Sequence, residues 1–216
     1  MSQISHRILI VVVLLTVAEW SFSRTVSRVQ TRRTTSSYSD GWHPAYQRYI
    51  RSKIPNSIVK STPNQVKALC PKYGVLRNSQ KEDFWAHLIE VLSLSESGHR
   101  RTLRYKENGL GRDPVTGTYT FSEGLLQLSY ADSRYWKCDF NWSVDQNKGS
   151  SDPSKSIFHP YKQFDCAFNI LHGHLVVKGR PLVTSKDHYW STLIYGRKGY
   201  NRLSASLKSK VAAYCY

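Results

Sequence analysis

The stretch that decides the fold runs from residue 79 to residue 97 and reads SQKEDFWAHLIEVLSLSES. Ser79 followed by Glu82 three residues later is the pattern of a capping box, which predicts where a helix begins. Apolar residues then recur at helical spacing, at Phe84, Leu88, Val91 and Leu92. The stretch is therefore predicted to be a long helix with one face in the core, and it carries Glu96 near its C-terminal end.

Glu96 gives this helix its chemical interest. A carboxylate near a helix C-terminus faces the negative end of the helix dipole, and apolar or aromatic neighbours would disfavour its ionised form. Both effects raise the pKa of a carboxyl group, which is the condition that a general acid needs at neutral pH. The alternative is an ordinary exposed carboxylate at a helix end, and the rest of the chain has to decide between the two.

The length and the first residues predict one folded domain behind an export signal. At 216 residues the chain is long enough for one domain with a full core. Residues 1–23 have a basic start, an apolar run from Ile8 to Val17 and small residues at Ser21 and Ser23, which is typical of a cleaved secretory signal. The apolar run is about half of the ~20 residues that a membrane-spanning helix needs, so stable membrane insertion is not expected. We expect a secreted protein, extracellular or periplasmic.

Composition divides the remaining chain at Trp42. Residues 24–41, RTVSRVQTRRTTSSYSDG, are rich in Ser, Thr and Arg and nearly free of large apolar side chains. Such a segment is predicted to be disordered and basic. Aromatic and aliphatic residues recur at helical spacing from Trp42 onward, so residues 42–216 are predicted to form the folded domain.

The net charge of +16 points to a polyanionic partner, such as a cell wall, an anionic polysaccharide, a lipid surface or a nucleic acid. The sequence contains no helix-turn-helix, RNP-like or zinc-finger pattern, and export makes a nucleic acid an unsuitable partner. We expect a monomer.

Cysteine usage predicts two disulfides. The even set Cys70, Cys138, Cys166 and Cys215 contains no CxxC spacing, which disfavours a zinc site. Four cysteines allow three connectivities. We expect Cys70 to pair with Cys215, which would tie the start of the domain to its end, and Cys138 to pair with Cys166.

The chain after the first long helix predicts one small β element and several more helices. Turn signals at 108–109 and 113–117 predict a hairpin flap within residues 101–121. Residues 122–136 return to a helical pattern around three leucines, and residues 138–156 are predicted to be a loop.

A second long buried helix is predicted to begin at Pro160. Its apolar positions are Phe164, Phe168, Leu171 and Leu175. Two shorter helices are predicted over residues 187–196, closed by Gly196, and over residues 202–216. The fold class is therefore α+β, mainly α: a helical domain with a small β-hairpin flap.

Three motifs follow one another: Glu96-Ser97, then GLLQ at 124–127, then FHPYKQFDC at 158–166. This order resembles the lysozyme-like superfamily, in particular goose-type lysozymes and soluble lytic transglycosylases, over roughly residues 64–176. The spacing between the first two motifs is longer than in that superfamily, by about the size of the hairpin. The superfamily's Ala-Tyr-Asn-Ala-Gly motif is absent, and Tyr189-Trp190 or Tyr195-Gly196 stands in that region. The resemblance is thus to a divergent secreted bacterial lysozyme.

The resemblance implies a lysozyme-like fold with a cleft beside the flap, and cleavage of the β-1,4 bond between N-acetylmuramic acid and N-acetylglucosamine in peptidoglycan. Glycoside cleavage needs a proton donor at the leaving oxygen, and Glu96 would be that donor. Aromatic faces would stack on sugar rings, and Gly124 would let a sugar approach the backbone closely. The residues expected to contact substrate are Ser97, Tyr119, Glu123, Gly124, Leu125, Gln127, Tyr130, Tyr189 and Trp190, although Leu125 is also expected in the core.

The second carboxylate of the reaction stays open. Glu123, Asp113 and Asp132 are available. A second carboxyl group about 5–5.5 Å from the first would indicate retention of configuration, and one about 6.5–9.5 Å away would indicate inversion. Without a close second acid, water or the 6-hydroxyl of muramic acid would attack, and the second route defines a lytic transglycosylase. We favour hydrolysis.

Other classes of function compete with the cleavage of peptidoglycan. A protein of this fold that has lost catalysis would only bind glycan, and a cationic antimicrobial protein would act through charge. Chitin or chitosan would need the same proton donor, although like-charge repulsion disfavours chitosan. His172-Gly173-His174 lacks a third metal ligand nearby, so neither a metal nor another cofactor is expected.

Overall fold

The computed structural model describes residues 40–216. The predicted signal at 1–23 and nearly all of the predicted basic segment at 24–41 lie outside the described residues. The last two residues of that segment are held at the end of the first long helix: the Gly41 N–H donates to the carbonyl of His99, and the Arg101 N–H donates to the Asp40 carboxylate.

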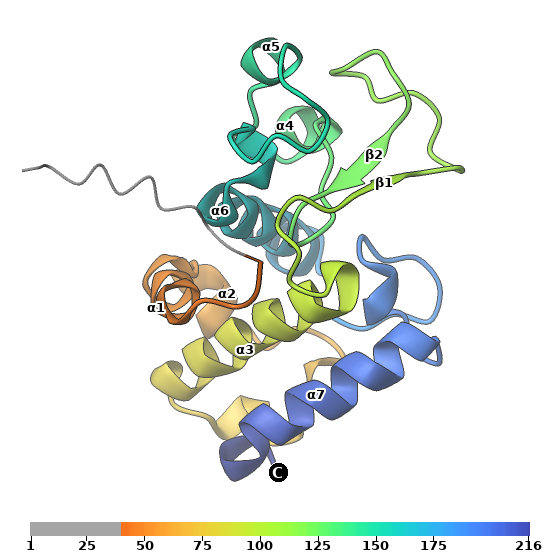
Figure 1. Cartoon of the computed structure of the whole chain (residues 1–216). Helices are drawn as coiled ribbons and strands as arrows, with labels where there is room; N and C mark the ends of the chain where they lie inside the picture. Colours follow the sequence, from red (N-terminus) through yellow and green to blue (C-terminus); the bar gives the residue numbers. More distant parts are fainter. Residues whose placement is uncertain (1–39) are drawn as a thin grey trace, which may run out of the picture. The chain divides into compact units, whose positions relative to one another are not determined.

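The described chain is mainly helical with one small antiparallel sheet, as the sequence predicted (Figure 1). The helices are α1 (Pro44–Lys53), α2 (Asn56–Lys60), α3 (Asn78–Ser97), α4 (Ala131–Tyr135), α5 (Trp142–Asp145), α6 (Pro160–Leu171) and α7 (Lys198–Cys215). Short 3-10 helices are η1 (Val66–Ala68), η2 (Tyr73–Val75), η3 (Ser156–Phe158) and η5 (Ser191–Leu193), and η4 (His172–Val177) is a π-helix. The strands are β1 (Arg104–Lys106) and β2 (Phe121–Glu123). None of the helices within residues 40–216 combines the length and the apolar character needed to cross a bilayer.

Helix α3 forms the centre of the core. It packs against α1, α2 and α7, and Figure 1 shows it running alongside α7. The predicted apolar positions Phe84, Leu88, Val91 and Leu92 are all buried. Burial of such side chains contributes roughly 1.5–3 kcal/mol each, so this face holds the helical part of the domain together.

The start of α3 differs from the prediction. The helix begins at Asn78, and the side chain of Gln80 accepts a hydrogen bond from the Arg77 N–H at 3.0 Å. The expected capping box of Ser79 and Glu82 is therefore wrong by two positions: Arg77 is the N-cap residue, and Gln80, three residues later, accepts its N–H. At the other end the left-handed Gly98 closes the helix directly after Ser97, as a C-terminal glycine does.

The predicted flap is a short hairpin. Strands β1 and β2 pair antiparallel, with Arg104 opposite Glu123 and Lys106 opposite Phe121. An isolated bridge between Arg112 and Tyr119 continues the pairing toward the tip. In Figure 1 the hairpin, α4 and α5 lie on one side of α6, and α1, α3 and α7 lie on the other.

Helix α6 begins at Pro160, as predicted, and α7 confirms the predicted C-terminal helix. The expected continuation of α6 to Leu175 takes the form of the π-helix η4. Gly173 lies in this segment, and a Cβ at that position would come within 2.5 Å of the Trp136 ring.

Two predicted helices are mostly absent. Within residues 122–136 only α4 is helical, and within residues 187–196 only η5 forms one turn. The predicted helix over residues 122–136 does not form before α4, because the backbones of Gly124 (φ 80°) and Gln127 (φ 50°) are left-handed and interrupt a right-handed helix. The predicted loop at 138–156 contains the short helix α5.

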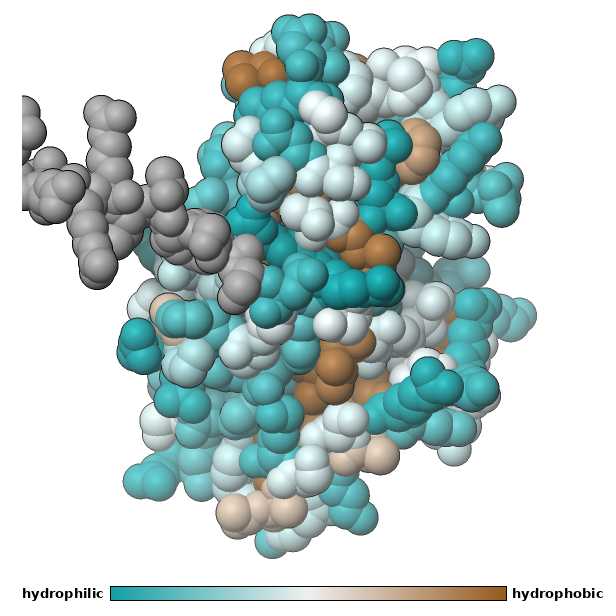
Figure 2. Space-filling model, in the orientation of Figure 1, coloured by the Kyte–Doolittle hydropathy of each residue, from teal (hydrophilic) through white to brown (hydrophobic). Residues whose placement is uncertain are grey.

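Both expected disulfides are present. Cys70 pairs with Cys215 across a sequence separation of 145 residues, and Cys138 pairs with Cys166 across 28 residues. The first joins the segment before η2 to the end of α7. The second fastens the segment after α4 to α6. On the face shown in Figure 2 the surface is largely hydrophilic, with apolar side chains in small separate areas.

Candidate active site

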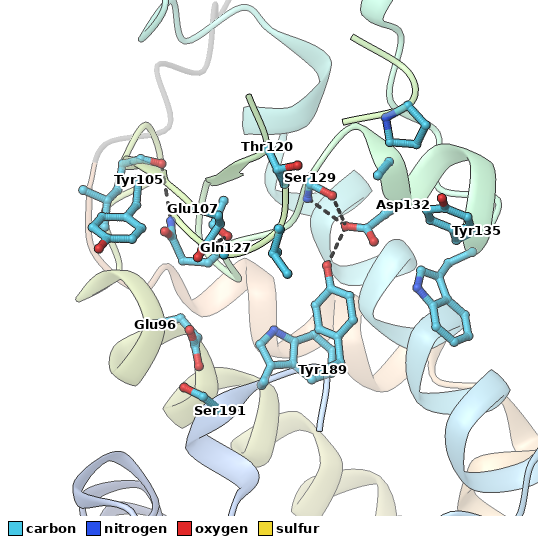
Figure 3. A pocket seen from close by; sticks show the side chains of 18 of the residues that line it. Glu96, Tyr105, Glu107, Thr120, Gln127, Ser129, Asp132, Tyr135, Tyr189 and Ser191 are labelled. Atoms are coloured by element: carbon cyan, nitrogen blue, oxygen red, sulfur yellow. Dashed lines mark hydrogen bonds between the residues drawn. The ribbon is translucent and has the colours of Figure 1, made fainter. Parts of the chain in front are cut away.

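A cleft with a volume of about 930 Å³ lies between the helical part and the flap. Its lining comes from the end of α3, the hairpin, the loop before α4, α4 itself and the segment that leads into η5 (Figure 3). Segments far apart in the sequence therefore build one site. Four of the residues predicted from the sequence line it, namely Glu96, Gln127, Tyr189 and Trp190.

Glu96 lies in the last turn of α3 and is half-buried at the wall of the cleft. The Thr192 hydroxyl of η5 donates to its Oε1 at 2.6 Å. Burial raises the pKa of Glu96, the Thr192 hydrogen bond lowers it, and the negative charge of Glu107 raises it again, with a net rise. A carboxyl group that keeps its proton to higher pH than an exposed one is suited to donate that proton.

Ser97 does not line the cleft but locks the end of α3 to the GLLQ loop. Its buried hydroxyl lies within hydrogen-bond distance of two carbonyls, that of Ser93 at 3.0 Å and that of Leu125 at 2.9 Å. Because the helix end and the loop are tied at the residue next to Glu96, the position of the carboxyl group relative to the loop is fixed.

The GLLQ loop is a tight turn closed at both ends. The Glu123 N–H donates to the Leu128 carbonyl at 2.7 Å, and the Leu128 N–H donates back to the Glu123 carbonyl at 3.0 Å. Leu125 and Leu126 are buried in the core. Gln127 remains at the cleft, with its side-chain amide donating to the Gly124 carbonyl at 2.9 Å.

Gly124 serves the fold rather than the sugar contact that the sequence suggested. Its φ is 80°, and a Cβ there would lie 2.3 Å from Nε2 of Gln163. The fully buried Gln163 of α6 donates to the carbonyls of Glu123 and Ile157 and accepts from the Leu126 N–H. The glycine therefore makes room for the side chain that fastens the loop to α6.

Trp190 and Tyr189 support the cleft from the side of η5. The Trp190 indole N–H donates to the Leu126 carbonyl at 2.9 Å. The Tyr189 hydroxyl donates to Oδ2 of Asp132 at 2.5 Å, and the same oxygen accepts the Ser129 N–H at 2.7 Å. Figure 3 shows this three-residue network on the opposite side of the cleft from Glu96.

Asp132 is a buried acid that faces the cleft. Burial raises its pKa to about 6, while the hydrogen bonds from Tyr189 and Ser129 act in the opposite direction. Its hydrogen-bond partners account for its position, and it holds the aromatic wall to the start of α4.

Glu107 lies on the flap just after β1, and sequence reasoning missed it. The Glu107 backbone N–H donates to the Thr120 carbonyl at 3.0 Å, and the Ser122 hydroxyl donates to the Glu107 carboxylate. Glu107 lines the same cleft as Glu96. Figure 3 shows Glu107 on the same side of the cleft as Glu96. The negative charge of Glu107 raises the pKa of Glu96, so the two carboxyl groups interact electrostatically.

The other acids considered from the sequence are held elsewhere. Glu123 is buried and paired with Arg104 at 3.2 Å; burial raises its pKa and Arg104 opposes that rise. Asp113 is buried and accepts backbone N–H groups from Val115, Thr116 and Ala131. Neither lines the cleft.

Two aromatic residues predicted to contact substrate also lie away from the cleft. Tyr130 is buried and donates to Asp145. Tyr119 is exposed on the outer part of the flap, with the Lys106 ammonium 3.4 Å from its ring centroid. The aromatic lining is instead supplied by Tyr105, Tyr135 and Trp136 together with Tyr189 and Trp190.

Thr192 and Trp136 are functional candidates that no sequence signal identified. Thr192 lies in the stretch that was predicted as a short helix, and no motif there points to Glu96; the fold brings the two side chains together. Trp136 follows α4 and lines the cleft, and its ring packs on Gly173. The described residues 40–216 contain no cluster of three or more His, Cys, Asp or Glu arranged to hold a metal ion.

Comparisons with known proteins give a likeness of fold. No family model and no curated protein matches the chain. Solved structures of DslA (Bd0314), a Bdellovibrio protein, match it with a TM-score of 0.65 at 22% identity, covering 80% of this chain and 91% of that one. They include a wild-type form and two mutants in which one glutamate is replaced by glutamine, the second at a TM-score of 0.64.

Proposed function

We propose that this protein is a secreted glycosidase that cleaves the β-1,4 bond between N-acetylmuramic acid and N-acetylglucosamine in peptidoglycan, with Glu96 as the general acid. The observation that carries the proposal is the half-buried Glu96 at the wall of a large cleft, with its pKa raised by burial. An acid whose pKa is raised keeps its proton to higher pH than an exposed carboxyl group and can give that proton to a leaving oxygen.

The remaining features of the cleft fit a sugar chain. Its walls combine aromatic rings with hydroxyl and amide groups, which are the groups that stack on sugar rings and bind their hydroxyls. Two disulfides fit an oxidising compartment outside the cytoplasm, where peptidoglycan lies.

Glu107 is our candidate for the second carboxylate. It lines the same cleft and influences the pKa of Glu96 through its charge. The two DslA mutants carry their glutamate-to-glutamine substitutions at positions eleven residues apart, and Glu96 and Glu107 are also eleven residues apart. A carboxylate there would activate water or stabilise the positive charge that develops on the sugar, which favours hydrolysis over the transglycosylase route.

The test is mass spectrometry of fragments released from purified peptidoglycan by the wild type and by Glu96→Gln. We expect fragments with free reducing ends from the wild type and none from the variant. Fragments with 1,6-anhydro ends would instead identify a lytic transglycosylase. Glu82→Gln is the matched control, because Glu82 lies on α3 but away from the cleft and should leave cleavage unchanged.

The net charge of +16 favours a second candidate, a cationic protein that binds the wall without cutting it. Fragment release separates the two, and Glu96→Gln removes the proton donor while changing the net charge by one unit at most, so charge-driven binding should persist in the variant. Wall binding that persists with no fragments from the wild type would establish the binding protein and refute the glycosidase.

A further inference from the structure

A second hollow adjoins the cleft at Trp136. It has a volume of about 700 Å³, and Tyr135 and Trp136 line both hollows, so these two rings form a shared ridge. The far side of the ridge is lined from the chain after α4, the end of α6 and the π-helix η4. A ligand that lies in the cleft can therefore extend across the ridge without leaving the protein surface.

The ridge is firmly built. Trp136 packs so closely on η4 that only glycine fits at position 173, where a Cβ would lie 2.5 Å from the ring. The disulfide between Cys138 and Cys166 fastens the next part of the chain to α6. Lys137, between the ring and the disulfide, has a left-handed backbone with φ 57°, which is an unfavourable conformation for a residue with a side chain.

The second hollow is positively charged. Lys137 and Lys178 line it together with His172 and Asn169, and no carboxylate is among its lining residues. The Lys178 ammonium lies 4.8 Å from the Trp136 ring centroid. Within residues 40–216 neither lysine forms an ion pair with a carboxylate. Two unneutralised ammonium groups beside exposed apolar surface, supplied by Tyr135 and Val177, suit a ligand that is both anionic and partly apolar.

We propose that this hollow binds the peptide stem of the substrate through the stem's carboxylates, while the glycan strand occupies the cleft. The inference rests on the proposed function and specifies its substrate as glycan that carries peptide stems. In peptidoglycan the stem branches from muramic acid, so the stem of a sugar held near the ridge can reach Lys137 and Lys178. The alanyl side chains and the methylene groups of the stem lie on Tyr135 and Val177, and its carboxylates face the two ammonium groups.

Binding to the Glu96→Gln protein tests this inference without turnover. The two probes are a peptidoglycan tetrasaccharide with both stems and the same tetrasaccharide from which an amidase has removed the stems, each titrated by calorimetry. We expect the stem-bearing probe to bind about ten-fold more tightly, since two partly exposed ion pairs contribute modestly each. Adding Lys137→Met and Lys178→Met should remove that difference and leave the affinity for the stripped probe unchanged.

Lys53→Met with Lys208→Met is the matched control. Both lysines are exposed, each lies over a tyrosine ring, at 5.9 and 4.9 Å, and neither lines the cleft or the second hollow. This pair removes the same charge and should keep the ten-fold preference. Equal affinity for the two probes, or an equal loss in both lysine pairs, overturns the inference.

Fragment release and probe binding together distinguish the absence of a stem site from the absence of glycosidase activity. If the wild type releases glycan fragments but the two probes bind equally, only the stem site is refuted. If no fragments appear and neither probe binds, the proposed function is refuted, and the stem site is refuted with it.

Discussion

At the residue scale, the state of Glu96 results from three opposing effects. Burial raises its pKa most, the Thr192 hydroxyl lowers it, and the Glu107 charge raises it. A general acid works only while protonated, so its pKa sets the alkaline limb of the pH profile of kcat/KM. The two neighbours act in opposite directions and can be removed one at a time by substitutions that keep side-chain size.

Thr192→Val removes the hydrogen bond to Glu96 and keeps the shape of the side chain. The ionised form of Glu96 then loses a donor, so the pKa of Glu96 rises and the alkaline limb moves to higher pH. Cleavage of a soluble glycan fragment measured across pH checks this. A limb that stays in place or moves to lower pH would contradict the assignment of Glu96 as the titrating acid.

Glu107→Gln removes a negative charge from the cleft. The pKa of Glu96 then falls, and the alkaline limb of the residual activity moves to lower pH, opposite to the shift in Thr192→Val. If Glu107 also serves as the second carboxylate, kcat should fall about 100-fold or more, because the developing charge or the attacking water loses its partner. A kcat equal to that of the wild type, together with a shifted alkaline limb, would mean that Glu107 acts only through its electrostatic influence on Glu96.

The sequence predicted Glu96 because a helix pattern and a neighbouring motif both pointed to it. Glu107 and Thr192 carried no such pattern. Glu107 reaches the cleft through the register of a three-residue strand pair, and Thr192 through one 3-10 turn near the end of the chain. Alternation and helical spacing do not report contacts of that kind between distant segments.

At the element scale, the junction of α3, the GLLQ loop and α6 positions the acid. Ser97 ties the helix to the loop, and Gln163 ties the loop to α6. The long helices α3, α6 and α7 were predictable because their apolar spacing persists over several turns. The conformation of the GLLQ loop was not predictable, because its two leucines and Leu128 after them fit a helical pattern, whereas the left-handed backbone at Gln127 is not visible in the sequence.

Gly124→Ala should destabilise this junction. The new Cβ would need a left-handed backbone and would lie 2.3 Å from Gln163, whose buried hydrogen bonds would have to shift. We expect a loss of roughly 2–4 kcal/mol in the free energy of unfolding, measured by urea denaturation. Gly149→Ala is the matched control, since nothing lies within 4 Å of a Cβ there, and its stability should be nearly unchanged. Similar stabilities of the two variants would show that Gln163 moves aside at little cost.

At the scale of the whole molecule, the two disulfides constrain very different lengths of chain. The Cys70–Cys215 bond encloses α3, the cleft and the flap within one covalent loop, because its ends are 145 residues apart. The Cys138–Cys166 bond closes only 28 residues, beside the Trp136 ridge. The Cys70–Cys215 bond therefore constrains the domain as a whole, and the Cys138–Cys166 bond constrains one side of the cleft.

Removing each bond separately should show this difference. Chain-entropy arguments give about 5 kcal/mol for the longer loop and about 3.5 kcal/mol for the shorter one, so Cys70→Ala with Cys215→Ala should lower the free energy of unfolding more than Cys138→Ala with Cys166→Ala. All four cysteines are buried, so each pair loses comparable packing, and each double variant is the control for the other. Denaturant unfolding gives both values. A greater loss of stability from the shorter loop would mean that native-state contacts near the ridge, rather than the entropy of the unfolded chain, determine what each bond contributes.

Substrate affinity should separate the two bonds in the opposite order. Loss of Cys138–Cys166 frees the chain next to Lys137 and should weaken the binding of stem-bearing glycan. Loss of Cys70–Cys215, in any molecules that remain folded, should leave that affinity intact.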